Sequence, residues 1–380
     1  MGDAAPQIIP QMDPWLGEEE LEGVTRVLAA GWITEGREAE AFAESLRGLI
    51  GAPYGVLAPN GTLALALALM ALEIGPGDEV LLPDTTFIGS ATAVALSGAT
   101  PVFADVEPDG YQIDVARAER HLTGRTRAIM PVHLYGTACD MDGVTAFAAR
   151  HGLRVIEDAA QGIGVSYRGE EVSGHVGSLG DAGCFSFFAD KTVTTGEGGF
   201  VACRDPAVFD RLLHLRNQGR AERGSFVHPE IGFNFRITDL QAAVGRAQLA
   251  KLPEIVARKT ALHAAYRAAL SDIPELRILG AAPGAGLVPF RCVLIAERAA
   301  ALGGYLTARG VQVRGFFYPL HRQPCFAGAG SAARNDALYP NAIHGYEHGL
   351  CLPIFPQLAG EQVAEIAALI RAFYGRPAAG

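Results

Sequence analysis

Short apolar runs alternate with segments of helical composition from about residue 50 to residue 205, and Gly, Pro, Asp or Asn stands at each boundary. Runs of this length between helices predict strands that are buried on both faces, in a mostly parallel sheet covered by helices. The predicted strands are Glu79–Leu82, Pro101–Ala104, Ala128–His133, Leu153–Glu157, Gly183–Phe187 and Gly199–Cys203. The pattern therefore predicts an α/β domain.

The stretch from Leu63 to Leu72 has a large residue at every second position, which by periodicity alone suits a strand. Its residues are alanine, leucine and methionine, which are strong helix formers, and no β-branched residue interrupts them. Asn60, Gly61 and Thr62 precede it and provide a helix cap. We therefore expect a buried helix here.

A long helical pattern from Thr238 to about Leu270, broken near Pro253, is expected to lead out of the sheet domain. The rest of the chain carries its own short elements. They are a strand at Arg291–Ile295, a helix near Arg298–Arg309, the apolar segment Val311–Pro319 and a closing helix at Glu361–Phe373. We expect a large domain at residues 1–250, with an N-terminal arm, and a small α+β domain at residues 251–380.

Composition and charge narrow the class of protein. The 380 residues include 31 Lys plus Arg against 41 Asp plus Glu, a formal charge of -10, which repels nucleic acids and anionic membranes. The six cysteines form no CxxC pair, and the first 15 residues do not resemble a signal peptide. No apolar run is long enough for a membrane span. We expect a cytoplasmic globular protein that binds neither nucleic acid nor membrane.

The candidate chemistry begins with a lysine that follows a predicted buried strand. Lys191 ends the run Cys184-Phe-Ser-Phe-Phe-Ala-Asp, and Thr-Val-Thr-Thr-Gly-Glu-Gly-Gly comes directly after it. Hydroxyls and glycines in such a turn let a ligand approach the backbone closely. Taken alone, the segment also suits a surface lysine beside a hairpin turn.

Two further segments suit ligand binding. Asp158 ends the strand that begins at Leu153, so it lies at the carboxyl edge of the sheet, where open α/β folds bind ligands. Gly61 and Thr62 open a helix, and a helix N-terminus favours a phosphate. A capping aspartate and an ordinary helix start are the simpler explanations of each segment alone. His344 and His348 have metal-compatible spacing but lack a third ligand, so no metal is predicted.

Together, in this order, these segments resemble the DegT/DnrJ/EryC1/StrS family of sugar aminotransferases. The likeness extends along the chain through Asp13-Pro-Trp-Leu-Gly, Gly31-Trp-Ile-Thr, Pro131-Val-His-Leu-Tyr-Gly, Gly232-Phe-Asn-Phe-Arg-Ile-Thr-Asp and Gly315-Phe-Phe-Tyr-Pro-Leu-His. It implies the pyridoxal-phosphate-dependent transferase fold type I, similar to aspartate aminotransferase, with a mostly parallel central sheet and a smaller C-terminal α+β domain.

The resemblance assigns roles to single residues around pyridoxal 5'-phosphate. Lys191 is expected to form the Schiff base with the cofactor and to move the proton during transamination. The other residues expected to bind the cofactor are Gly61, Thr62, Phe87, Asp158, Gln161, Ser186 and Asn234. Among them, Asp158 would pair with the pyridine nitrogen, and Asn234 would reach the phosphate in a neighbouring subunit. The resemblance thus implies a homodimer with shared active sites.

For the sugar, the best candidates are Trp32 and the segment Phe316–His321 with Tyr318 and His321, because aromatic faces cover C–H surface and polar tips bind hydroxyls. A core aromatic cluster between the domains explains that segment equally simply. At position 188 many relatives have histidine, whereas this chain has phenylalanine, which resembles the subgroup of GDP-perosamine synthases. Asp190 stands where asparagine is the familiar residue.

These features favour transfer of an amino group from L-glutamate to a nucleotide-linked 4-keto-6-deoxy sugar, with GDP-4-keto-6-deoxy-D-mannose as first choice. Another keto sugar or a cyclitol ketone is the nearest alternative acceptor. A regulator that binds the cofactor without turnover is an alternative from another class.

Overall fold

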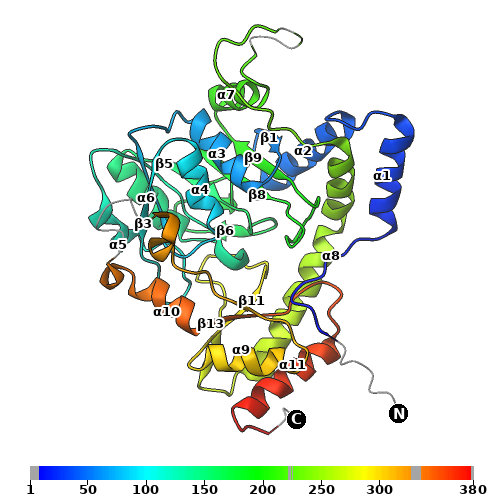
Figure 1. Ribbon diagram of the computed structural model, residues 1–380, viewed down its shortest axis with the longest axis vertical. Coiled ribbons are helices and arrows are strands. Elements are labelled where there is room, and N and C mark those ends of the chain that lie inside the picture. The colour runs from blue at the N-terminus through cyan, green and yellow to red at the C-terminus, as the bar shows by residue number, and fades with distance from the viewer. Residues whose placement is uncertain (1–7, 221–223, 225, 327–334, 378–380) are drawn as a thin grey trace.

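A seven-stranded sheet forms the centre of the larger part of the molecule (Figure 1). The computed structural model describes residues 8–220, 224, 226–326 and 335–377. The strand order is β1-β9-β8-β5-β4-β2-β3, and only β9 runs against its neighbours. The strands are β1 (Tyr54–Ala58), β2 (Glu79–Pro83), β3 (Thr100–Ala104), β4 (Thr126–Ile129), β5 (Arg154–Asp158), β8 (Ala182–Ser186) and β9 (Gly199–Cys203). The predicted mostly parallel sheet is confirmed.

Helices cover both faces of this sheet because successive strand residues point to opposite sides. In β2, Val80 and Leu82 join one apolar cluster and Leu81 joins the other. The first cluster includes α3 (Gly61–Ala71), α4 (Gly89–Leu96) and α7 (Pro206–Arg216), and the second includes α2 (Arg37–Ile50) and α6 (Met141–His151). Burial on both faces explains why the strands read as continuous apolar runs.

The C-terminal part has a four-stranded antiparallel sheet of order β10-β11-β13-β12. Its elements are β10 (Leu276–Ile278), β11 (Cys292–Ala296), α9 (Ala299–Thr307), β12 (Arg314–Gly315), α10 (Pro340–His348), β13 (Gly349–Leu352) and α11 (Gly360–Phe373). A third apolar cluster fills the space between this sheet, α9 and α11, and it includes Ile9 of the N-terminal segment. Ile9 pairs with Val311, so this segment lies against the C-terminal part.

One long helix, α8 (Asp239–Leu270), joins the two parts and runs along one side of the molecule (Figure 1). The predicted break near Pro253 is wrong, because α8 continues through that residue. Pro253 is exposed while Leu252 and Ile255 are buried, so packing holds the helix across the one hydrogen bond that proline cannot donate. The expected domain boundary after residue 250 falls inside α8.

The predicted helix at Leu63–Leu72 is confirmed as α3, and Asn60 caps it by accepting a hydrogen bond from the Leu63 N–H at 3.0 Å. Strand β1 and the short strands β10 and β13 carried no prediction, and neither did β6 (Ser166–Arg168) and β7 (Ser173–His175). The remaining helices are α1 (Glu18–Ala30) and the short α5 (Val115–Ala118). Within the described residues, no helix has both the length and the apolar character needed to cross a membrane.

Candidate active site

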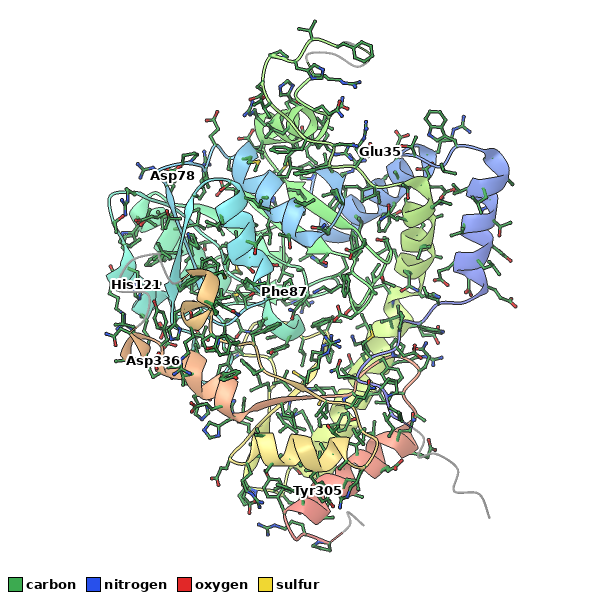
Figure 2. The ribbon with its side chains drawn as sticks, viewed as in Figure 1. Glu35, Asp78, Phe87, His121, Tyr305 and Asp336 are labelled. Atoms are coloured by element: carbon green, nitrogen blue, oxygen red, sulfur yellow. The ribbon has the colours of Figure 1, made fainter. Side chains whose placement is uncertain are left out.

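A cavity of about 640 Å³ lies where the carboxyl ends of β5 and β8 meet the start of α3 and the C-terminal part. Asp158 and Ser186 are the last residues of those two strands, and both line it. Phe290, Arg291, Arg314 and Phe317 close it from the C-terminal part. Figure 2 shows Phe87, another lining residue, near the middle of the molecule, between the large sheet and the C-terminal elements.

The start of α3 provides an anion site on one side of this cavity. Gly61 and Thr62 lie in the first helical turn, where N–H groups have no intrahelical acceptor and the helix dipole is positive. Ser186 of β8 packs directly against this turn, since a Cβ added to Gly61 would lie 2.7 Å from the Ser186 Cβ. Glycine therefore lets α3 approach β8, and the N–H groups and the Ser186 hydroxyl suit a phosphate.

Asp158 is a buried carboxylate that is held by neutral donors. Its exposed fraction is 4%, its Oδ2 accepts a hydrogen bond from the Ser90 hydroxyl at 2.7 Å, and its Oδ1 accepts one from the Ala160 N–H at 3.1 Å. It takes part in none of the ion pairs among the described residues. A buried charge without a counter-charge is costly, so this carboxylate suits a cationic N–H of a bound ring.

Gln161 is oriented by an unusual backbone conformation at Tyr135. The Tyr135 N–H donates to Gln161 Oε1 at 2.6 Å, and Tyr135 has φ 56°, in the left-handed region that a non-glycine residue seldom adopts. Because the carbonyl end of Gln161 is occupied, its NH₂ group is the end left to donate into the cavity.

Lys191 lies in the turn after β8, and its Nζ is 4.7 Å from the centre of the Phe290 ring. Burial lowers the pKa of Lys191, while the negative charges of Asp190 and Asp158 oppose that shift. A lysine with a lowered pKa is more often a free amine at neutral pH, and the free amine is the nucleophilic form. The structure thus brings Lys191 and Asp158, two of the predicted site residues, into one cavity.

The cavity also contains Gly61, Thr62, Phe87, Gln161 and Ser186 from the predicted set. Four other predicted residues do not line it, namely Trp32, Asn234, Tyr318 and His321. Trp32 is exposed and donates to the Glu35 carbonyl, and Asn234 pairs with Asn217 on the segment after α7. Tyr318 packs edge-on against Tyr346.

His321 is buried and its ring nitrogens are engaged by Asp84 at 2.6 Å and Asp336 at 3.1 Å, so it fastens the C-terminal part to the loop after β2. Of the aromatic segment around it, Phe317 is the residue that reaches the cavity. Sequence reasoning missed Ser90, Tyr135, Arg291 and Arg314 as site residues. Ser90 follows Phe87 by three positions at a helix start, which is the one local signal that identifies it.

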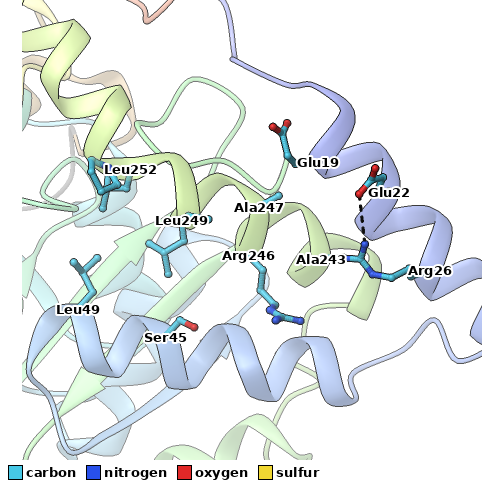
Figure 3. A pocket seen from close by; sticks show the side chains of 12 residues that line it. Glu19, Glu22, Arg26, Ser45, Leu49, Ala243, Arg246, Ala247, Leu249 and Leu252 are labelled. Atoms are coloured by element: carbon cyan, nitrogen blue, oxygen red, sulfur yellow. Dashed lines mark ion pairs between the residues drawn. The ribbon is translucent and has the colours of Figure 1, made fainter.

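A second hollow, of about 610 Å³, lies between α1, α2 and α8 and is remote from this chemistry (Figure 3). Ala243, Ala247 and Ala250 of α8 contribute to its lining, and its lining side chains include one ion pair, between Arg26 and Glu22. In the described part of the chain, no group of three His, Cys, Asp or Glu side chains could hold a metal ion.

Comparisons with known proteins agree with the geometry. The family model of the DegT/DnrJ/EryC1/StrS aminotransferase family matches residues 14–371. A GDP-perosamine synthase from Escherichia coli O157:H7 is 36% identical over 371 residues, covering 96% of this chain and 98% of that protein. A UDP-N-acetyl-3-dehydro-α-D-glucosamine 3-aminotransferase from Acidithiobacillus ferrooxidans is 39% identical over 359 residues, covering 94% of both chains.

Among solved structures, DesV from S. venezuelae superimposes with a TM-score of 0.90 at 34% identity, covering 98% of this chain and 100% of DesV. The match spans both parts of the molecule, so the sheet, α8 and the C-terminal part occur together in a known fold.

Proposed function

The chain belongs to the DegT/DnrJ/EryC1/StrS aminotransferase family, and we propose that it transfers an amino group from L-glutamate to a nucleotide-linked 4-keto-6-deoxy sugar. As a member of that family it is a sugar aminotransferase that depends on pyridoxal phosphate. GDP-4-keto-6-deoxy-D-mannose is the proposed acceptor, because a relative covering nearly the whole chain is a GDP-perosamine synthase. The observation that carries the proposal is one cavity holding the Lys191 amine, the Asp158 carboxylate and the α3 N-terminus.

The lining residues fit the cofactor. The first turn of α3 and Ser186 suit its phosphate, and Phe87 offers an exposed aromatic face. Asp158, which is buried and has no ion-pair partner among the described residues, suits its ring nitrogen. Gln161 lines the same space, and its NH₂ group is the end left to donate there. We assign these residues, with Gly61 and Thr62, to cofactor binding.

When bound, pyridoxal phosphate supplies an electron-poor ring that accepts the electron pair left when the donor loses its α-proton. Asp158 favours the protonated form of the ring nitrogen, because an opposite charge at hydrogen-bonding distance stabilises a cation. Ser90 and the Ala160 N–H hold that carboxylate in place. Lys191 would carry the α-proton at Nζ from the donor carbon to the cofactor in the first half of the reaction, and would carry a proton from the cofactor to the acceptor carbon in the second half.

Asn234 lies outside the cavity of its own chain, on a segment with large exposed apolar side chains. Phe226 is 85% exposed and Ile231 is 87% exposed. Apolar side chains on a projecting segment favour a contact with a second copy. We therefore propose a homodimer in which Asn234 completes the partner's cofactor site.

The test is to incubate the purified protein with L-glutamate and each candidate acceptor, and to measure 2-oxoglutarate and the amino sugar. Release of 2-oxoglutarate with GDP-4-keto-6-deoxy-D-mannose is the expected result. Turnover only with a 3-keto sugar, the substrate class of the A. ferrooxidans relative, or only with a cyclitol ketone would replace the proposed acceptor. Absence of turnover with every ketone, in a protein that binds the cofactor, would favour a regulator.

A further inference from the structure

Asp190, directly before Lys191, is the one carboxylate among the described residues that contacts Arg291 or Arg314. Both arginines belong to the C-terminal part and both bind the same oxygen, Oδ2. Arg314 does so at 3.4 Å. Two guanidinium groups therefore share one carboxylate oxygen at the edge of the cavity that Lys191 lines.

The two arginines differ in how fully their hydrogen-bonding capacity is used. The Arg291 side chain is 5% exposed and its guanidinium lies 4.4 Å from the centre of the Phe290 ring. The Arg314 side chain is 58% exposed, and in the described part of the chain its guanidinium makes a single hydrogen bond, to Asp190. Because a guanidinium has five N–H donors in a planar fork, Arg314 keeps a free edge for a bidentate anion.

Positive charge is in excess around Asp190. The Lys191 and Lys259 amines lie 4.7 Å and 5.8 Å from the same Phe290 ring that Arg291 covers. Two guanidinium groups thus face one carboxylate, and a second anion would reduce the repulsion between them.

The position suits a carboxylate of the amino donor. The donor nitrogen must take the place of the lysine amine, and in an α-amino acid the carboxylate is two bonds from that nitrogen. Arg291 and Lys191 lie over one ring, so an anion site beside Arg291 is within reach of a small amino acid. A sugar nucleotide carries its phosphates beyond the whole hexose ring, farther from the reacting carbon.

Resting on the proposed function, we propose that Arg314, supported by Arg291, binds a carboxylate of the amino donor, at a place that the Asp190 carboxylate partly occupies when no donor is bound. Asp190 thereby acts as an internal competitor, and it keeps the buried Arg291 paired. The chain's own carboxylate is then part of donor recognition.

The test uses the purified protein with its cofactor and glutarate, a dicarboxylate that has no amino group and cannot react. Binding is measured by calorimetry. Arg314→Gln is expected to weaken glutarate binding by about tenfold or more, because a charge-assisted hydrogen bond is lost. Asp190→Asn is expected to tighten it, because the internal competitor is removed. The matched control is Arg309→Gln on the surface after α9, where Arg309 contacts Tyr305 and not the cavity.

Measuring GDP binding to the same variants distinguishes an arginine that binds the donor from one that binds the nucleotide. Loss of GDP binding with unchanged glutarate binding in Arg314→Gln would assign this arginine to the nucleotide and overturn the proposal. If Asp190→Asn has the melting temperature of the parent protein but binds glutarate more weakly, the competitor role is overturned. Neither measurement needs the acceptor, so a wrong choice of keto sugar leaves this test intact.

Discussion

The whole chain contains three lysines, Lys191, Lys251 and Lys259, and their surroundings differ. Lys191 lines the cavity, Lys251 pairs with Glu20 at 2.6 Å, and Lys259 is buried beside Thr192. Borohydride reduction of the cofactor-loaded protein, followed by peptide mapping, is expected to place the cofactor label on Lys191. Lys191→Ala should remove both the label and turnover, whereas Lys251→Ala should keep the label. A label on Lys259 would show that the wrong amine was assigned.

Lys259 gives the protein a pH-dependent stability. Burial, with a further contribution from Arg291, lowers the pKa of Lys259 from 10.5 to about 7, against the opposing charge of Asp190. Between those two pH values the unfolded chain binds more protons than the folded one, so this group makes the free energy of unfolding rise with pH. Below about pH 7 both states are protonated, and the full cost of burying the ammonium remains.

Lys259→Met should therefore be more stable than the parent protein at pH 6, on the order of 1–3 kcal/mol, and this advantage should shrink towards pH 10. Urea unfolding at several pH values measures it. Lys259→Arg is the control, because arginine stays charged, and its difference from Lys259→Met should not change over that range. An advantage of Lys259→Met that grows with pH would contradict the assignment.

Asp158 and Ser90 provide a graded test of the ring-binding side of the cavity. Asp158→Asn keeps the shape and removes the charge, so kcat should fall by about 100-fold or more. Ser90→Ala keeps the charge and removes one hydrogen bond, so a fall of about tenfold is expected. Ser97→Ala is the control at the other end of α4, where the hydroxyl donates to the Val94 carbonyl and has no other partner among the described residues. Equal losses in Asp158→Asn and Ser97→Ala would indicate a folding defect instead.

Single residues were predictable where the backbone alone sets their direction. Asp158 and Ser186 end strands of a parallel sheet, so strand order alone brings them to one edge. The direction of Phe317, Tyr318 and His321 depends on tertiary partners such as Asp84 and Tyr346, which lie far along the chain or on another element. The sequence pattern contains no record of those contacts, which is why Tyr318 and His321 were expected in a cavity that they do not line.

At the level of elements, the close approach of α3 to β8 depends on Gly61. Gly61→Ala would place a methyl group 2.7 Å from the Ser186 Cβ, so α3 must move from the strand. Weaker cofactor binding, by about tenfold, and a lower melting temperature are expected, measured by spectroscopic titration and thermal unfolding. Gly48→Ala in α2 is the matched control, because nothing lies within 4 Å of the added Cβ. It should stabilise the protein by about 0.5–1 kcal/mol.

Elements with strong local signals were predicted correctly, and those held by neighbours were not. Helix α3 is fixed by the propensity of alanine and leucine and by the Asn60 cap. Helix α8 continues through Pro253 because Leu252 and Ile255 are packed on its buried side, which overrides the local preference. Strand β1 has a glycine at its second position and is held by its pairing with β9, so local composition does not identify it.

At the scale of the whole molecule, each active site of the proposed dimer contains residues of both chains. Lys191 lines the cavity of its own chain, whereas Asn234 lies outside it, on the segment between α7 and α8 whose described parts project from the body (Figure 1). If Asn234 completes the partner's site, a chain with Lys191→Ala and a chain with Asn234→Ala carry their defects in different sites of a mixed dimer. One of the two sites then contains both intact residues.

Lys191→Ala and Asn234→Ala proteins, each nearly inactive alone, should therefore regain activity when they are unfolded together and refolded as an equal mixture. Random pairing makes half of the dimers mixed, each with one intact site, so about a quarter of the activity of the parent protein is expected. The control mixture pairs Lys191→Ala with Asp158→Asn, both of which affect the cavity of their own chain. That mixture contains an intact site only if one of those two residues acts in the cavity of the other chain. Equal recovery in both mixtures, or none in the first, would show that Asn234 does not act across the dimer.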